Sequence, residues 1–188
     1  MPTDRTITPR WVLCLALLAC LIAANAASET HTMFDASAEG HSWQIVNDTV
    51  MGGRSSSTFD HTDEGFVFSG LLNNNGGGFA SVRARAPSGG ITGSDAIRLT
   101  VLGDGRTYQL RLNSRRHRYN YQHKFATRAG EWQTHTLPLD DFRASWRGRK
   151  LDRPAPDPTD VMGFGILLAD GRDGPFRIAV DRIEAIQR

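Results

Sequence analysis

The segment AIRLTVLGDGRTYQLRLN (Ala96–Asn113) shows the strand pattern of this 188-residue chain most clearly. Its first part, Ala96–Leu102, is rich in β-branched and aliphatic residues, a composition typical of strands. In Thr107–Asn113 polar and apolar residues alternate strictly, which predicts a strand with one buried face and one open face. Gly103-Asp104-Gly105 stands between the two runs and predicts a tight hairpin.

Shorter runs of the same kind follow along the chain, separated by Gly, Asn, Asp or Pro. They are Gly65–Gly70, Phe79–Ala86, Tyr119–Phe125, Trp132–Leu137, Met162–Leu168 and Phe176–Val180. Asp170–Pro175 predicts a second hairpin between the last two runs. The proline-rich segment 147–160 is expected to be a surface loop. Strands at this spacing predict an all-β fold, an antiparallel β-sandwich or barrel, in a single domain from 32 to 186.

Residues 1–26 have the layout of a secretory signal peptide. Basic residues precede an uninterrupted apolar run from Trp11 to Ala24, and the run ends in an A-x-A cleavage signal at Ala26. We therefore expect cleavage near Ala26 and an exported, periplasmic domain. A mitochondrial presequence is the less favoured alternative, because such segments are amphipathic and rich in Arg and Ser and lack a solid apolar block. Lipoprotein processing at Cys20 is an alternative, but the apolar run continues past this cysteine, which favours ordinary cleavage.

Composition argues against several classes of function. The formal net charge is only +2, so the basic excess of a nucleic-acid binder is absent and no nucleic-acid partner is expected. Both cysteines, Cys14 and Cys20, lie in the predicted signal segment, which leaves the domain without a thiol for a disulfide or a zinc site. No histidine pair has zinc spacing and no G-x-S-x-G motif occurs. We expect a protein without a catalytic residue, cofactor or catalytic metal; a structural calcium site at Asp170, Asp173 and Asp181 stays open.

Two glycine-rich segments could form a phosphate-binding loop. They are WQIVNDTVMGGRSSS (Trp43–Ser57) and NNNGGGFASVRAR (Asn73–Arg85). A predicted strand, with no lysine nearby, follows each group of glycines, whereas a phosphate loop opens a helix. The glycines therefore predict tight turns or close backbone packing. Asp48 is either a ligand for a hydroxyl group or cation, or a cap for its own loop, and the second interpretation is favoured.

A set of polar side chains is expected to share the face of the sandwich that points away from the core. Their neighbours of opposite parity are apolar or aromatic, so the polar set lies together if the strands belong to one sheet. The set is Arg83, Arg85, Gln109, Arg111, Asn113 and Gln122. Guanidinium and amide groups suit sugar hydroxyls, carboxylates or a peptide backbone. The alternative is a solvated sheet face without a ligand.

Two further features complete the candidate contact regions. Trp146 lies in the region expected to be a loop and is the best candidate for an exposed aromatic contact, with burial in the core as the alternative. The loop from Asp48 to Arg54 is expected to border the polar face. A binding surface of this composition suits a peptide backbone as well as sugar hydroxyls, so a protein partner and a carbohydrate both stay open.

The glycine-rich segments also carry a resemblance to a known family. The elements VNDTVMGGRS and GGGFASVR resemble those of the complex I intermediate-associated protein 30 family. The matching motif positions are Trp43, Asn47, Asp48, Met51, Gly52, Gly53, Ser55, Gly77, Gly78 and Phe79. The resemblance implies a galactose-binding-like jelly roll and a non-enzymatic, chaperone-like assembly factor that acts on a membrane-associated protein complex. The alternative function is a periplasmic or cell-surface carbohydrate-binding module.

Overall fold

The computed structural model describes residues 30–36 and 42–188, and this part of the chain forms thirteen strands and three short 3-10 turns. The predicted signal segment, with its cleavage site near Ala26 and Cys20, lies outside the described residues. Within the described part, no helix has the length and apolar character needed to cross a membrane.

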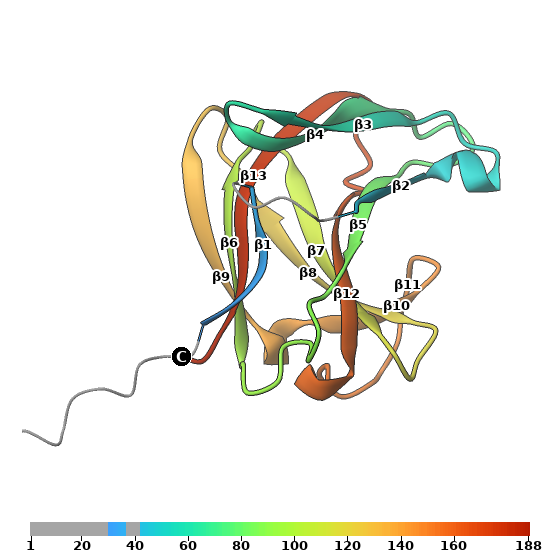
Figure 1. Ribbon diagram of the computed structural model, residues 1–188. Helices are drawn as coiled ribbons and strands as arrows, with labels where there is room; N and C mark the ends of the chain where they lie inside the picture. The colour runs from blue at the N-terminus through green and yellow to red at the C-terminus, as the bar shows by residue number, and fades with distance from the viewer. Residues whose placement is uncertain (1–29, 37–41) are drawn as a thin grey trace, which may run out of the picture.

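The strands form two sheets with antiparallel pairing, which enclose the core between them (Figure 1). The six-stranded sheet has the order β3 (Ser56–Thr62), β4 (Gly65–Leu72), β13 (Gly174–Ile186), β6 (Ala96–Leu102) and β9 (Trp132–Pro138), with β1 (Thr30–Asp35) also paired to β13. The long strand β13 pairs with β4 along its first half and with β1 and β6 along its second.

The seven-stranded sheet carries most of the polar residues selected above. Its order is β11 (Arg149–Lys150), β10 (Arg143–Trp146), β8 (Asn120–Ala126), β7 (Thr107–Ser114), β12 (Val161–Leu168), β5 (Ala80–Arg85) and β2 (Gln44–Asn47). The 3-10 turns are η1 (Asp48–Met51), η2 (Leu139–Asp141) and η3 (Pro158–Asp160). The prediction of an all-β antiparallel sandwich is confirmed.

The core is built by the alternation that the sequence shows. Tyr108, Leu110 and Leu112 of β7 are all completely buried. Burial of an aliphatic side chain of this size contributes about 1.5–3 kcal/mol, so alternate residues on each strand hold the two sheets together. At one end the indole ring of Trp43 packs on Phe34, with ring centroids 5.0 Å apart, and on Phe164 at 5.4 Å.

The two expected hairpins are not hairpins. The connection at residues 103–106 joins β6 of one sheet to β7 of the other, and the connection at 169–173 joins β12 to β13 in the same way. The turn signals themselves are genuine, because Gly105 has a φ of +86° and Gly171 a φ of +76°. A local turn signal does not determine whether the two strands pair, and here each strand pairs with others of its own sheet.

Candidate functional site

The outer face of the seven-stranded sheet, which points away from the core, presents its side chains in ordered rows. The register across six strands aligns Gln44, Arg83, Gly165, Arg111, Gln122 and Arg143 in the central row. On one side follow Ser81, Leu167, Gln109 and Lys124, and on the other Arg85, Gly163, Asn113, Asn120, Ser145 and Lys150. All six polar residues selected from the sequence therefore lie on this face, because their strands belong to one sheet.

A cleft of about 540 Å³ lies on this outer face. Five of the residues selected from the sequence line it: Arg83, Gln109, Arg111, Gln122 and Trp146. Met51 and Phe79, which belong to the two glycine-rich segments, line it as well. The cleft therefore brings the polar rows, an aromatic ring and the loops that carry the family resemblance into one surface.

The charge of the cleft has one sign. Arg83, Arg111, Lys124, Arg147 and Lys150 line it, whereas no aspartate or glutamate is among its described lining residues. The guanidinium of Arg147 lies 5.6 Å from the ring centroid of Trp146, a cation–π distance. The cleft as a whole therefore attracts anionic groups.

Arg83 and Arg111 flank Gly165 at the same register, on the two neighbours of β12. A Cβ atom at position 165 would lie 3.1 Å from Cγ of Arg83 and 2.4 Å from the carbonyl oxygen of Val82, so only glycine leaves this space open. Burial lowers the pKa of Arg83. Burial, with added repulsion from Arg83, lowers the pKa of Arg111 to about 10.

Asp48 joins the two glycine-rich segments. Its buried carboxylate accepts hydrogen bonds from the backbone N–H of Ser55 at 2.9 Å, of Gly78 at 2.6 Å and of Phe79 at 3.3 Å, and from Oγ of Ser55 at 2.7 Å. Burial alone would raise the pKa of Asp48, but these hydrogen bonds together hold it below its usual value. The side chain thus acts as a cap within its own loops.

The glycines of this motif make room for that carboxylate. An added Cβ would lie 2.3 Å from Cγ of Asp48 at Gly53, and 2.4 Å from its Oδ2 at Gly77. Gly52 and Gly78 instead have positive φ angles, +89° and +116°. The segments therefore form a tight junction that fixes Met51 and Phe79 at one end of the cleft.

The remaining selected residues lie outside the cleft lining. Arg54 is exposed next to the Asp48 junction, and Arg85 is exposed at the end of β5. Asn113 is half-buried in the row beyond Arg111.

Trp146, which lines the cleft and was expected in a loop, instead belongs to strand β10, with 38% of its surface exposed.

Sequence reasoning missed three basic residues of the cleft. Lys124 could have been found, because it has the same parity as Gln122 in the run Tyr119–Phe125. Arg147 and Lys150 belong to the short hairpin of β10 and β11, which the sequence did not predict. Arg147 has a positive φ of 47°, unusual for a residue with a side chain, and it has no local sequence signal.

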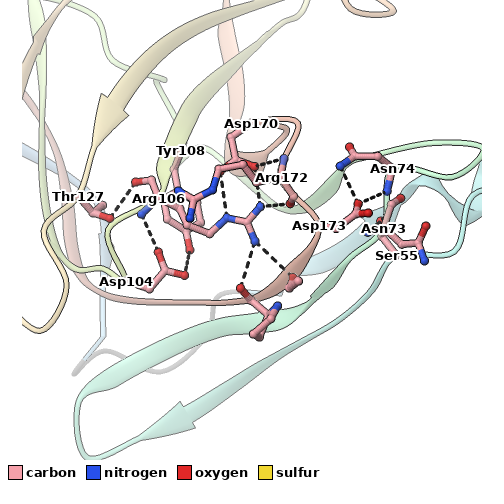
Figure 2. Close-up of polar contacts among 12 residues, drawn as sticks. Ser55, Asn73, Asn74, Asp104, Arg106, Tyr108, Thr127, Asp170, Arg172 and Asp173 are labelled. Carbon is pink, nitrogen blue, oxygen red and sulfur yellow. Dashed lines mark hydrogen bonds and ion pairs between the residues drawn. The ribbon is translucent and has the colours of Figure 1, made fainter.

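A second polar cluster fixes the two connections that cross between the sheets (Figure 2). The guanidinium of Arg106 binds the carboxylate of Asp170 and donates to the carbonyl oxygens of Arg172, Gly174 and Pro175. Beside it, Oδ1 of Asp173 accepts two hydrogen bonds from Asn74, both 2.7 Å long. Two of the three carboxylates considered for calcium, those of Asp170 and Asp173, thus bind protein groups. Among the described residues no cluster with the make-up of a metal site is found.

Comparison with known proteins identifies relatives for nearly the whole domain. Residues 32–180 match the family described as Complex I intermediate-associated protein 30. The mitochondrial protein of this name from Drosophila melanogaster is 27% identical over 184 residues, which cover 82% of this chain and 62% of the fly protein. The mouse protein is 25% identical over 166 residues, covering 75% of this chain and 51% of its own length. The chain thus spans only part of these relatives.

Solved structures of similar fold include carbohydrate-binding modules. A family 11 module from Clostridium thermocellum, in complex with a mixed-linked tetrasaccharide, has a TM-score of 0.58 at 13% identity and covers 87% of this chain and 98% of its own. A family 29 module variant complexed with cellulohexaose has a TM-score of 0.56 at 11% identity, covering 86% and 93%. At such identities the likeness shows the fold alone.

The comparisons correct one prediction and confirm another. The fly, worm and mouse relatives are all named as mitochondrial proteins, so the prediction of an exported, periplasmic protein is wrong. The apolar N-terminal pattern had favoured export, but it does not by itself distinguish the targets of leader segments. The resemblance seen in the glycine-rich segments is confirmed by the match over residues 32–180: the chain belongs to the complex I intermediate-associated protein 30 family.

Proposed function

We propose that this chain is a non-enzymatic binding domain that takes part in the assembly of respiratory complex I by holding a protein partner in the cleft. Family membership supports the assembly role, since the family and its relatives are named as proteins associated with complex I intermediates. The observation that carries the proposal is the cleft itself, which combines basic, amide, aromatic and aliphatic side chains on one outer sheet face.

The lining of the cleft suits binding better than catalysis. Among its described lining residues there is no histidine, aspartate, glutamate or cysteine, the groups that most often serve as general bases or nucleophiles. Ser145 is the hydroxyl residue of the lining, and no histidine, aspartate or glutamate is among the described residues that line the cleft beside it. A site of this composition holds a ligand by charge and packing.

The apolar end of the cleft favours a protein as the occupant. Val50 and Met51 of η1 are 69% and 64% exposed, and Met51 lines the cleft with Phe79. Exposed aliphatic side chains beside a polar cleft are typical of protein-binding surfaces, and methionine adapts to irregular partner surfaces. A chaperone-like role, in which the domain holds an incomplete subunit, follows from this adaptable end.

Affinity purification tests the assembly role. The tagged full chain is recovered from detergent-solubilised membranes and the proteins bound to it are identified by mass spectrometry. We expect subunits of complex I, and a smaller yield with the variant Met51→Asp, which charges the apolar end. Arg98→Gln, on the outer face of the other sheet, serves as the control and leaves the yield unchanged. Recovery without complex I subunits would contradict the proposal.

A carbohydrate is the second candidate occupant, because one observation favours it. Trp146 is 38% exposed and lines the same cleft as Gln109 and Arg111, an arrangement that suits a sugar ring stacked on indole. The modules of similar fold are described in complex with a tetrasaccharide and with cellulohexaose. Calorimetric titration of the full chain with these two sugars decides the matter: heat of binding that disappears in Trp146→Ala supports a carbohydrate-binding role.

A further inference from the structure

The centre of the cleft holds two positive charges that pair with no carboxylate of residues 30–36 and 42–188. Arg83 of β5 and Arg111 of β7 lie at the same register on either side of Gly165. The ion pairs recorded among the described residues include neither of them. Buried or half-buried arginines usually have a paired carboxylate, so this arrangement needs an explanation.

The two arginines destabilise one another in the free protein. Both are half-buried, and the pKa of each is lowered by burial, with mutual repulsion adding to the effect at Arg111. An anion placed between the two guanidinium groups would offset both the cost of burial and the repulsion. Gly165 leaves the floor beneath that position free of a side chain, so a small oxyanion can approach the sheet closely.

Neighbouring atoms indicate what accompanies the anion. Gln109 has only 6% of its surface exposed and lines the cleft, yet its Oε1 has no hydrogen-bond partner among the described residues. Nε of Arg111 has none there either. Gln109 lies two residues from Arg111 on the same face, about 7 Å along the strand. A matching ligand therefore carries an anion and, at that separation, a hydrogen-bond donor.

The apolar end sets a third requirement. Phe79, Ser81 and Arg83 have the same parity, so Phe79 lies on the outer face about 13 Å along the chain from Arg83. Together with Met51 and Leu167 it forms an apolar part of the lining. An inorganic anion such as phosphate offers no apolar surface, and a uronic-acid chain offers little.

We propose that the cleft recognises an acidic segment of a protein partner. An aspartate or glutamate carboxylate lies between Arg83 and Arg111 above Gly165, a backbone N–H of the segment donates to Oε1 of Gln109, and an apolar side chain packs against Met51 and Phe79. Guanidinium groups bind carboxylates through two parallel hydrogen bonds, which fixes the orientation of the segment. This inference rests on the proposed function, in which the occupant is a protein.

Binding of short peptides to the full chain tests the inference. The probe is a fluorescent, end-capped peptide of alternating leucine and aspartate, and the matched probe has asparagine in place of aspartate. We expect the aspartate peptide to bind at least tenfold more tightly in fluorescence anisotropy, a difference of about 1.4 kcal/mol. Increasing the salt concentration should weaken the binding of the aspartate peptide. Equal affinity of the two peptides would overturn the inference without requiring any variant to fold.

Variants then locate the site. Arg83→Gln and Arg111→Gln should each weaken the aspartate peptide at least tenfold, whereas Arg98→Gln on the opposite sheet should leave it unchanged. Arg111→Lys keeps the charge without the planar fork and should weaken binding less than Arg111→Gln. The melting temperature of free Arg111→Gln should be unchanged or raised, since a repulsive charge is removed. A lower melting temperature, with peptide affinity unchanged, would assign Arg111 a structural role and overturn the inference.

Two further probes distinguish the sources of the anion. Inorganic phosphate and oligogalacturonate, an acidic sugar chain, are titrated in the same way. If either probe binds more tightly than the aspartate peptide and loses affinity in Arg111→Gln to the same extent, the assignment to a protein segment is overturned. If the peptide fails while complex I subunits still co-purify with Arg111→Gln, this inference is wrong and the proposed function stands.

Discussion

Arg106 and Asp170 form a buried, two-point ion pair, with Nε of Arg106 3.0 Å from Oδ2 and Nη2 2.6 Å from Oδ1. The two side chains are only 6% and 8% exposed. The ion pair raises the pKa of Arg106, while that of Asp170 is lowered by the same hydrogen bonds despite its burial. The pair links the connection between β6 and β7 to that between β12 and β13, where the chain crosses from one sheet to the other (Figure 2).

Removal of one partner should destabilise the fold strongly. Arg106→Met leaves the carboxylate of Asp170 buried without its cation, which costs about 3–5 kcal/mol in the free energy of unfolding. Urea denaturation measures the loss. The exposed pair of Arg128 and Glu131 is the control, and Arg128→Met should cost less than about 1 kcal/mol. Equal losses at the two positions would contradict a structural role for the Arg106 pair.

The double variant gives a stricter test of the same pair. Arg106→Met combined with Asp170→Leu removes both charges, so no buried charge is left unpaired. We expect the double variant to be more stable than Arg106→Met alone, although the lost hydrogen bonds to the carbonyl oxygens of Gly174 and Pro175 keep it below the wild type. A fully additive loss would show that the two side chains act independently.

The hydrogen bonds to Asp48 should make stability depend on acid. The pKa of Asp48 is lower in the folded protein than its ordinary value of 3.8, so protonation costs more in the folded state than in the unfolded state. This contribution is therefore fully present above pH 3.8 and is lost as the pH falls through the lowered value. Asp48→Asn should flatten this part of the curve of unfolding free energy against pH, with Asp170 and Asp157, whose pKa values are also lowered, supplying remaining slope.

At neutral pH the same substitution should destabilise the junction. An asparagine has one acceptor oxygen in place of two, so at least one of the N–H groups of Ser55, Gly78 and Phe79 loses its partner. An unsatisfied buried donor costs about 1–3 kcal/mol. An unchanged unfolding free energy at pH 7 would contradict the assignment of Asp48 as the cap of the two loops.

Glycine at position 77 should be needed for space. An added Cβ would lie 2.4 Å from Oδ2 of Asp48, so Gly77→Ala has to displace the carboxylate and its hydrogen bonds, at a cost of about 2–4 kcal/mol. Gly171 has a positive φ but open space around its Cα, and Gly171→Ala should cost only about 1–2 kcal/mol for the strained backbone. Thermal unfolding compares the two; a larger loss at Gly171 would be the opposite of what the geometry requires.

Period-two alternation predicted the fold and the polar face, because each strand alternates core and outer residues regardless of its partners. Arg111 and Gln122 could thus be assigned to one face before their pairing was known. The sheet in which a strand lies depends on contacts between distant segments. That is why the signal at Gly103-Asp104-Gly105 was misinterpreted as a hairpin, although β6 pairs with β9 and β13.

The parts of the site that the sequence did not reveal lack a local pattern. Strand β10 has four residues and β11 only two, too few to show alternation, and together they carry Trp146 and Lys150 into the cleft. The junction at Asp48 likewise depends on residues about thirty positions apart, Asp48 and Gly78. The sequence allowed Trp146 and Asp48 to be selected by residue type, whereas their arrangement in the structure follows from tertiary packing.

Two tryptophans that are exposed among the described residues offer the sharpest comparison of the two faces of the sandwich. Trp146 lines the cleft, and Trp132 is 48% exposed on β9 of the other sheet. Truncation of an exposed ring costs little stability, but a ring that contacts a ligand often contributes 2 kcal/mol or more, about thirtyfold in affinity. We expect Trp146→Ala to lower the affinity for the acidic peptide at least tenfold, and the same loss for a sugar if a sugar is the occupant. Trp132→Ala should leave the affinity for either ligand within twofold of the wild type. Both variants should unfold within about 0.5–1 kcal/mol of the wild type. Equal effects of the two substitutions on affinity would place the binding surface away from the cleft, since the two rings share nothing but their exposure.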